Sequence, residues 1–170
     1  RQSLLKGIML HRLGRVGFVV LVVLYLSVIL AGFLSTYHPA EHHRKAAYHP
    51  PTPLKFSFQH GLHVSAYQLE DVALKRYSLQ GNKVSRVKLF APGFSYRVLG
   101  VIPARRHLLQ VEQGGHLFLL GSDHFGRDVL ARLLYGGRVS MSIGLIGVAI
   151  SFSLGLLVGG ISGYFGGRID

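Results

Sequence analysis

Two long apolar stretches without a charged residue dominate the hydropathy pattern of this chain. The first, VGFVVLVVLYLSVILAGFL, covers residues 16–34, and 14 of its 19 residues are Val, Leu, Ile or Phe. At about 1.5 Å per residue, a helix of this length crosses roughly 28 Å of hydrocarbon. The pattern therefore predicts a transmembrane helix over residues 16–35.

The second stretch, VSMSIGLIGVAISFSLGLLVGGISGYF, covers residues 139–165 between Arg138 and Arg168. Its 27 uncharged residues exceed the minimum for a span. We expect a second transmembrane helix over residues 139–163 and a cytoplasmic turn over residues 164–170. Small residues recur along it at intervals of four, which is typical of close helix packing in lipid. The predicted packing seam consists of Gly147, Ser151, Gly155, Gly159 and Gly163.

The distribution of basic residues predicts the topology. Residues 1–15 carry four Lys or Arg and no acid, so the positive-inside rule places the N-terminus in the cytoplasm. Residues 36–120 then lie outside the membrane. An uncleaved anchor is favoured over a signal peptide, because the apolar run is longer than the usual signal core and no small-x-small cleavage site ends it cleanly.

Between the apolar stretches, turn signals separate short runs of β-forming residues. Residues 36–53 are rich in Pro and His and predict an irregular exit from the membrane. Strands are expected over residues 72–79, 84–90 and 95–102, with turns at Gly81-Asn82 and Pro92-Gly93 and a last apolar run over residues 117–120. The expected fold is an α-helical integral membrane protein: two transmembrane helices of a larger bundle, with a small extracytoplasmic β meander between them.

Composition supports a membrane protein. Hydrophobic residues make up 49% of the chain and charged residues only 15%, with a mean hydropathy of +0.35, which excludes intrinsic disorder. A net charge of +12 would suggest nucleic-acid binding in a soluble protein. Here the charges belong to the membrane flanks and to the extracytoplasmic segment, so no nucleic-acid partner is expected.

The sequence offers little for catalysis. It contains no cysteine, and no GxxxxGK[ST] phosphate loop occurs, so the chain is not expected to be an ATPase or another enzyme. Ser95 and Asp71 are interpreted as solvated surface residues.

Nine of the ten histidines lie between the apolar stretches, including His42-His43 and the pair His60 and His63. Their spacing is not that of a metal site, so we expect surface histidines and neither a metal nor a cofactor.

The segment GSDHFGRDVLARLLYGGR, residues 121–138, predicts an amphipathic helix at the membrane interface. Ser122 or Asp123 can cap its N-terminus, and Gly136-Gly137 is expected to end it. Asp128 and Arg132 are expected to form an ion pair one turn apart. For Asp123, Arg127 and Asp128, capping and local ion pairing is favoured over a direct role in substrate binding.

The string LLGSDHFGRDVLARLLYGGRVSMSIGLIGVAIS, together with GLLVGGISGYFGGRID, resembles the second permease subunits of bacterial ABC importers for dipeptides, oligopeptides and nickel. The resemblance is specific from residue 121 to 170. Ser122 replaces the usual Thr of that family and Ala131 the usual Ser. The positions that match the family pattern before the second span are Gly121, Ser122, Asp123, Gly126, Arg127, Asp128, Arg132, Leu133, Tyr135, Gly136 and Arg138.

The resemblance implies a multi-pass permease of the bacterial inner membrane with about six helices. Its partners would be a homologous second permease, two cytoplasmic ATPase subunits that use the ATP, an extracytoplasmic substrate-binding protein and the lipid bilayer. The later spans are absent from these 170 residues, so we expect an N-terminal fragment or a truncated chain. Dipeptide, oligopeptide and nickel permeases share these residues, so the substrate stays open.

The alternative is a two-span receptor with an extracytoplasmic sensory domain. Its topology is the same, but it requires a helical linker after the second span. The sequence GYFGGRID, a glycine-rich turn, is poorly suited to transmit helix motion.

Overall fold

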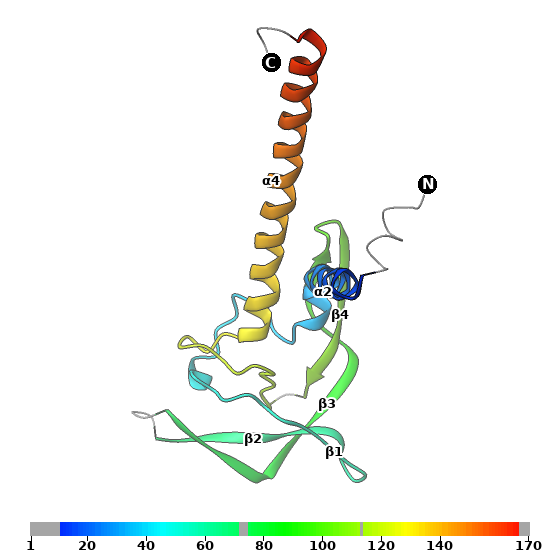
Figure 1. Cartoon of the computed structure of the whole chain (residues 1–170). Coiled ribbons are helices and arrows are strands. Elements are labelled where there is room, and N and C mark those ends of the chain that lie inside the picture. The colour runs from blue at the N-terminus through cyan, green and yellow to red at the C-terminus, as the bar shows by residue number, and fades with distance from the viewer. Residues whose placement is uncertain (1–10, 72–74, 113, 167–170) are drawn as a thin grey trace. The chain divides into compact units, whose positions relative to one another are not determined.

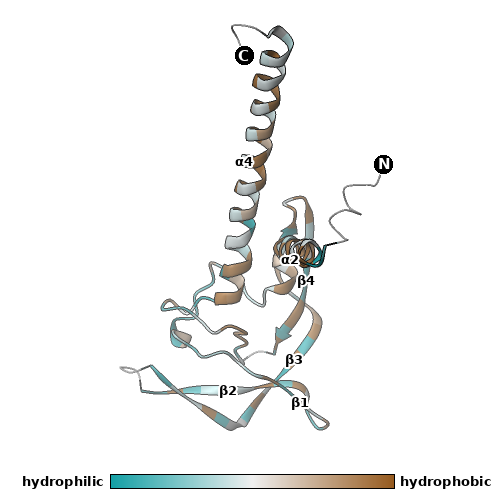
Figure 2. Cartoon of the chain, in the orientation of Figure 1, coloured by the Kyte–Doolittle hydropathy of each residue, from teal (hydrophilic) through white to brown (hydrophobic). Residues whose placement is uncertain are grey.

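The computed structural model describes residues 11–71, 75–112 and 114–166. These residues divide into two compact units, one ending at Tyr135 and one beginning at Gly136. Along the chain, an apolar helix is followed by a four-stranded β-sheet and then by a second, longer apolar helix (Figure 1). Both helices carry mainly hydrophobic residues on their surface (Figure 2). By length and composition, Arg12–Ile29 and Val129–Tyr164 can each cross a membrane.

Helix α2 (Arg12–Ile29) occupies most of the first apolar stretch. It ends at Ile29, before the expected end at residue 35, because Leu30 leaves helical geometry with φ −86° and ψ 13°. The chain then continues in the short helix α3 (Ala31–Leu34). Ser35 closes this turn, since its Oγ donates a hydrogen bond of 2.6 Å to the carbonyl of Ala31. The predicted span over residues 16–35 is therefore two helices with a break at Leu30.

Helix α4 (Val129–Phe165) has 37 residues and a length of about 55 Å. The expected amphipathic helix over residues 121–138 is corrected in two respects. Residues 121–128 form turns and an isolated bridge, so the helix begins only at Val129. Gly136 and Gly137 lie inside the helix and do not end it. A glycine ends a helix when it turns left-handed, and neither Gly136 nor Gly137 does so.

The sheet is an antiparallel meander in the order β1-β2-β3-β4. Its strands are β1 (Leu54–Ser57), β2 (Gly61–Asp71), β3 (Arg76–Val98) and β4 (Ile102–Val111). A 3-10 turn, η1 (Arg44–Ala46), precedes them. Val64, Val87 and Leu117 form the small hydrophobic core of the sheet.

Several strand predictions are wrong in position. Gly81-Asn82 and Pro92-Gly93 do not reverse the chain but lie within the 23-residue strand β3. The pairing register shifts beside both of them, between Ser65 and Ala66 on β2 and between Pro92 and Tyr96 on β3. Bulges therefore absorb the turn-forming residues and bend the strand. Residues 72–74 of the first expected strand lie outside the described residues, and residues 117–120 are not a strand.

Helix α3 packs against strands β3 and β4, so the end of the apolar helix is attached to the sheet. The imidazole of His107 is fully buried, and its Nδ1 lies 2.8 Å from the carbonyl oxygen of Ser35. Gly32 lies directly against the ring of Tyr96, where a Cβ atom would overlap ring carbons. This close approach needs a residue without a side chain.

We predict that Gly32→Ala destabilises the chain by about 1–3 kcal/mol, because the added methyl group overpacks the contact with Tyr96. Gly17→Ala is the matched control, since it lies on α2 with nothing within 4 Å of the added atom. There the helix propensity of alanine is expected to leave stability unchanged or slightly raised. Thermal unfolding of the purified chain in detergent micelles measures both variants. Equal effects at the two sites would contradict the docking of α3 on the sheet.

Candidate functional site

The loop over residues 121–128, directly before helix α4, holds most of the charged residues that the sequence singled out. Ser122 and Asp128 form an isolated antiparallel bridge across it. The N–H of Gly126 donates to the carbonyl of Asp123 at 2.9 Å, and the N–H of Asp123 donates to the carbonyl of Arg127 at 3.0 Å. Gly121 and Gly126 have φ of 80° and 74°, a conformation that favours glycine. The loop is thus a compact turn.

The carboxylate of Asp123 is the centre of this turn. Its Oδ1 accepts the N–H groups of Phe125 at 2.8 Å and Arg127 at 3.0 Å. Its Oδ2 accepts Nε of Arg127 at 2.8 Å and Nη1 of Arg132 at 2.6 Å. Arg132 thus binds Asp123, and the ion pair that was expected between Arg132 and Asp128 is replaced by this one. The Asp128 side chain is buried at the start of the helix, where it accepts the N–H of Leu130 and does not reach Arg132 on the surface.

Burial alone would raise the pKa of Asp123, whose side chain is only 12% exposed. The hydrogen bonds from Arg127, Phe125 and Arg132 outweigh burial and hold the pKa of Asp123 well below its ordinary value. The carboxylate is therefore charged and fully occupied by donors of the loop itself. Such a carboxylate is suited to holding structure and not to transferring protons.

Asp128 has the opposite environment. Its side chain is buried, and its Oδ1 accepts the N–H of Leu130 at 3.1 Å at the start of α4. Burial raises the pKa of Asp128 to about 6, although the N–H groups of Leu130 and Ala131 favour its charged form. Asp128 is the residue that caps the long helix.

Residues 43–52, which the sequence predicted only as an irregular exit from the membrane, bind the loop through their backbone. The N–H of His43 donates to the carbonyl of Gly126 at 3.1 Å, and the N–H of Tyr48 donates to the carbonyl of Asp123 at 3.0 Å. Ser122 and His49 exchange two bonds, from Ser122 N–H to the His49 carbonyl at 2.9 Å and from His49 N–H to Ser122 Oγ at 2.8 Å. At Gly126, a Cβ atom would overlap the His43 carbonyl.

Aromatic rings and histidines fill the space beside this contact. Phe118 is fully buried, and the rings of Tyr37, His43 and His49 have centroids 5.2, 5.5 and 5.2 Å from it. His116 stacks on Phe118 at 5.7 Å. Burial lowers the pKa of His49 and His116. The expectation of surface histidines is therefore wrong for His49, and also for His63 and His107, which are buried.

The remaining predicted site residues do not join this cluster. The ring of Tyr135 lies 6.4 Å from that of His38, and the carbonyl of Arg138 accepts the hydroxyl of Ser142 at 2.7 Å. A Cβ atom at Gly136 would meet nothing within 4 Å, and the same holds for the seam glycines, which lie exposed on α4. The members of the seam are Gly147, Ser151, Gly155, Gly159 and Gly163.

The arrangement holds two segments of the chain together through backbone hydrogen bonds. In residues 11–71, 75–112 and 114–166, no three His, Asp or Glu side chains gather as a metal site requires. The sequence signal that could have revealed the contact was the pair Gly121 and Gly126, because glycines on either side of a fixed Asp mark close backbone approach.

Comparison with known proteins relates parts of the chain to transport permeases. Residues 4–51 match a family described as the N-terminal TM domain of oligopeptide transport permease C. The dipeptide transport system permease protein DppC of Haemophilus influenzae is 48% identical over 59 residues, which are 35% of this chain and 20% of the relative. DppC of Bacillus subtilis is 48% identical over 50 residues, 29% of this chain and 16% of the relative.

The nickel transport system permease protein NikC of Escherichia coli is 43% identical over 51 residues, 30% of this chain and 18% of the relative. No solved structure matches the chain. The matched residues span about a fifth or less of the length of these curated relatives. The resemblance inferred from the sequence is confirmed: parts of the chain are similar to permease subunits of ABC transporters for peptides and nickel.

We predict that Asp128→Asn stabilises the chain at neutral pH. The folded pKa of about 6 lies above the ordinary 3.8, so the folded state binds the proton more tightly than the unfolded state. The stability contributed by Asp128 is therefore complete below 3.8 and is lost as pH rises through 6. Asparagine keeps the accepting oxygen without the charge, and the difference is expected to reach about 3 kcal/mol at pH 8.

Thermal unfolding between about pH 5 and pH 8 measures this effect. Wild type should lose stability relative to Asp128→Asn across that range. Glu112→Gln is the control, because it removes a solvent-exposed ion pair with Lys88 and should keep the wild-type profile. Parallel profiles for wild type and Asp128→Asn would show that the buried carboxyl is not raised in pKa.

Proposed function

We propose that this chain forms part of the transmembrane path of an ABC importer for peptides or a related small substrate, in the bacterial inner membrane. ATP would be hydrolysed on partner subunits, since no phosphate-binding loop occurs in the sequence. The observation that carries the proposal is the family match over residues 4–51, which includes the whole of helix α2. The curated relatives are named as transport permeases for dipeptides, oligopeptides and nickel.

The exposed surface of the two long helices supports a place in the membrane. Large apolar side chains such as Leu21, Leu24, Ile146 and Leu157 are between 43% and 61% exposed. Leaving such surface in water is unfavourable by about 25 cal/mol per Å². The lipid bilayer removes this cost. Four Lys or Arg before residue 16 favour a cytoplasmic N-terminus, with the sheet outside the membrane.

Within the importer, the loop over residues 121–128 would set the outer end of α4. Asp128 caps the helix, and Arg132 on its first turn binds Asp123 of the loop. The glycine and serine seam further along α4 would pack against a neighbouring helix of the same permease or of the homologous second permease. Transport would follow alternating access, driven by two cytoplasmic ATPase subunits and supplied by an extracytoplasmic substrate-binding protein.

A two-span receptor is the rival function. It shares the two apolar helices and the intervening sheet with the permease. The match of residues 4–51 to a permease family supports the importer over the receptor.

The proposed topology predicts which side of the membrane each segment faces. The chain has no cysteine, so single-cysteine variants can be labelled selectively. Lys55→Cys, exposed on β1, should react with a membrane-impermeant maleimide in intact spheroplasts, whereas Arg12→Cys, exposed at the start of α2, should react only after the membrane is opened. The reverse pattern would invert the topology, and labelling of both in intact spheroplasts would contradict a membrane-spanning α2.

We predict that Gly155→Leu with Gly159→Leu abolishes assembly or uptake by the full-length permease, because leucine prevents close helix approach along the seam. The matched control is Ala149→Leu with Ser153→Leu, because each of these residues lies two positions, or about 200° around the helix, from the seam residue Ser151. Uptake of a labelled dipeptide and copurification of the second permease are the measurements. Unchanged uptake in the seam variant would contradict the packing role of these glycines.

A further inference from the structure

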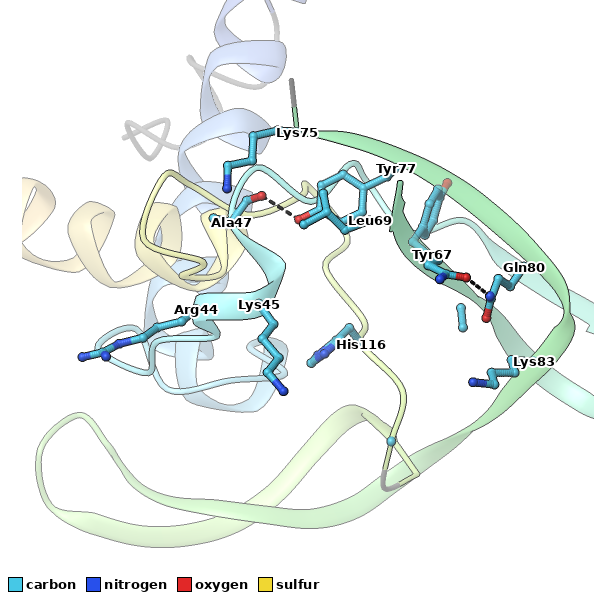
Figure 3. A pocket seen from close by; sticks show the side chains of 13 residues that line it. Arg44, Lys45, Ala47, Tyr67, Leu69, Lys75, Tyr77, Gln80, Lys83 and His116 are labelled. Atoms are coloured by element: carbon cyan, nitrogen blue, oxygen red, sulfur yellow. Dashed lines mark hydrogen bonds between the residues drawn. The ribbon is translucent and has the colours of Figure 1, made fainter. Parts of the chain in front are cut away.

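A polar cavity of 860 Å³ lies between η1, strands β2 and β3, and the segment around His116 (Figure 3). It belongs wholly to the unit that ends at Tyr135 and is separate from the loop over residues 121–128. Its wall includes the amide side chains of Gln68 and Gln80 and the ring of Tyr67. None of these residues was singled out by the sequence.

Four cations surround this cavity, and no acidic side chain of the described residues lines it. They are Arg44, Lys45, Lys75 and Lys83. No carboxylate of the described residues forms an ion pair with any of them. Lys45 and Lys83 extend from opposite sides, with the His116 imidazole between them (Figure 3). Cations gathered without counter-charges raise the local concentration of anions.

The fold builds this arrangement from distant parts of the chain. The hydroxyl of Tyr77 on β3 donates to the carbonyl of Ala47 at 2.6 Å, which holds the segment after η1 against the sheet. Lys83 lies in the irregular part of β3, where pairing jumps from Gln80 with Ala66 to Val84 with Ser65. A bulge of this kind turns a side chain away from the regular alternation of a strand.

We propose that this cavity binds an acidic peptide segment, with carboxylate side chains between Lys45 and Lys83. An inorganic anion would fill only a small part of 860 Å³. The amide of Gln80 donates to that of Gln68, and the remaining polar atoms of this pair can exchange hydrogen bonds with peptide groups. The rings of Tyr67 and Tyr77 offer apolar contact to side-chain stems. The segment can belong to an imported peptide or to a partner protein, because both present the same carboxylates. The proposal stands on the cavity and does not require that the chain transports.

Titration calorimetry tests the site on the full-length permease in nanodiscs of neutral lipid. The probe is acetylated and amidated tetraglutamate, with tetraglutamine of the same form as the neutral comparison. Lys45→Gln with Lys83→Gln should weaken tetraglutamate binding by about tenfold or more, because two charge-assisted contacts are lost. Lys55→Gln, an exposed cation on β1 outside the cavity, is the matched control and should bind as wild type does.

Reversing the charge at Lys45 and Lys83 gives a variant that should gain affinity for another ligand, so the test does not rest on a loss of binding alone. Lys45→Glu with Lys83→Glu should gain affinity for tetralysine while losing tetraglutamate. Equal weakening by Lys55→Gln would show a diffuse charge effect and overturn the site. Displacement of tetraglutamate by inorganic phosphate or by anionic vesicles at matched charge would overturn the peptide assignment in favour of a phosphate group.

Uptake measurements separate the two sources of the segment. If the segment belongs to a partner, the Lys45→Gln, Lys83→Gln variant should lose affinity for the substrate-binding protein while tripeptides of every charge are affected alike. If it belongs to the imported peptide, uptake of acidic tripeptides alone should fall. Loss of tetraglutamate binding in an importer that is otherwise active supports the site in either case. A permease that binds tetraglutamate but transports nothing would contradict only the proposed function.

Discussion

The charged, fully occupied carboxylate of Asp123 is the interaction on which the arrangement of this chain depends. It draws the backbone of Phe125 and Arg127 and the side chains of Arg127 and Arg132 around two oxygen atoms. Hydrogen bonds to a charged carboxylate are about twice as strong as neutral ones, and the Asp123 side chain is only 12% exposed. The turn that results exposes the carbonyls of Asp123 and Gly126 to the backbone of residues 43–48.

That contact joins the segment that follows α3 to the loop that precedes α4. Residues 43–49 follow α3 in the chain, and the loop over residues 121–128 leads directly into α4. On the other side, the buried imidazole of His107 bonds the carbonyl of Ser35 at the end of α3. Short backbone hydrogen bonds tolerate little displacement. In the proposed importer, the end of α3 and the start of α4 would therefore both be held by the extracytoplasmic unit. A movement of one of them would be transmitted to the other.

The charged residues of the loop and those of the cavity have different surroundings. The acidic residues of the loop bind groups nearby in the chain. Asp123 forms ion pairs with Arg127 and Arg132, and Asp128 accepts the N–H of Leu130 at the start of α4. The cations of the cavity beside β2 have no such partners among the described carboxylates. Paired charges stabilise a turn, and unpaired cations in a concave surface attract a ligand. The same excess of positive charge therefore serves anchoring at one place and recognition at another.

The sequence alone predicted the two apolar helices, the antiparallel meander and the resemblance of the charged loop to transport permeases, because hydropathy, periodicity and a dense local motif can be recognised in consecutive residues. It also indicated capping and ion pairing for Asp123 and Asp128. Only the tertiary structure decided that Arg132 binds Asp123, that β3 runs through Gly81 and Pro92, and that His49 bonds Ser122 across 73 positions. The reason is physical: backbone hydrogen bonds between distant segments require no particular side chains, so they leave no periodic trace in the sequence.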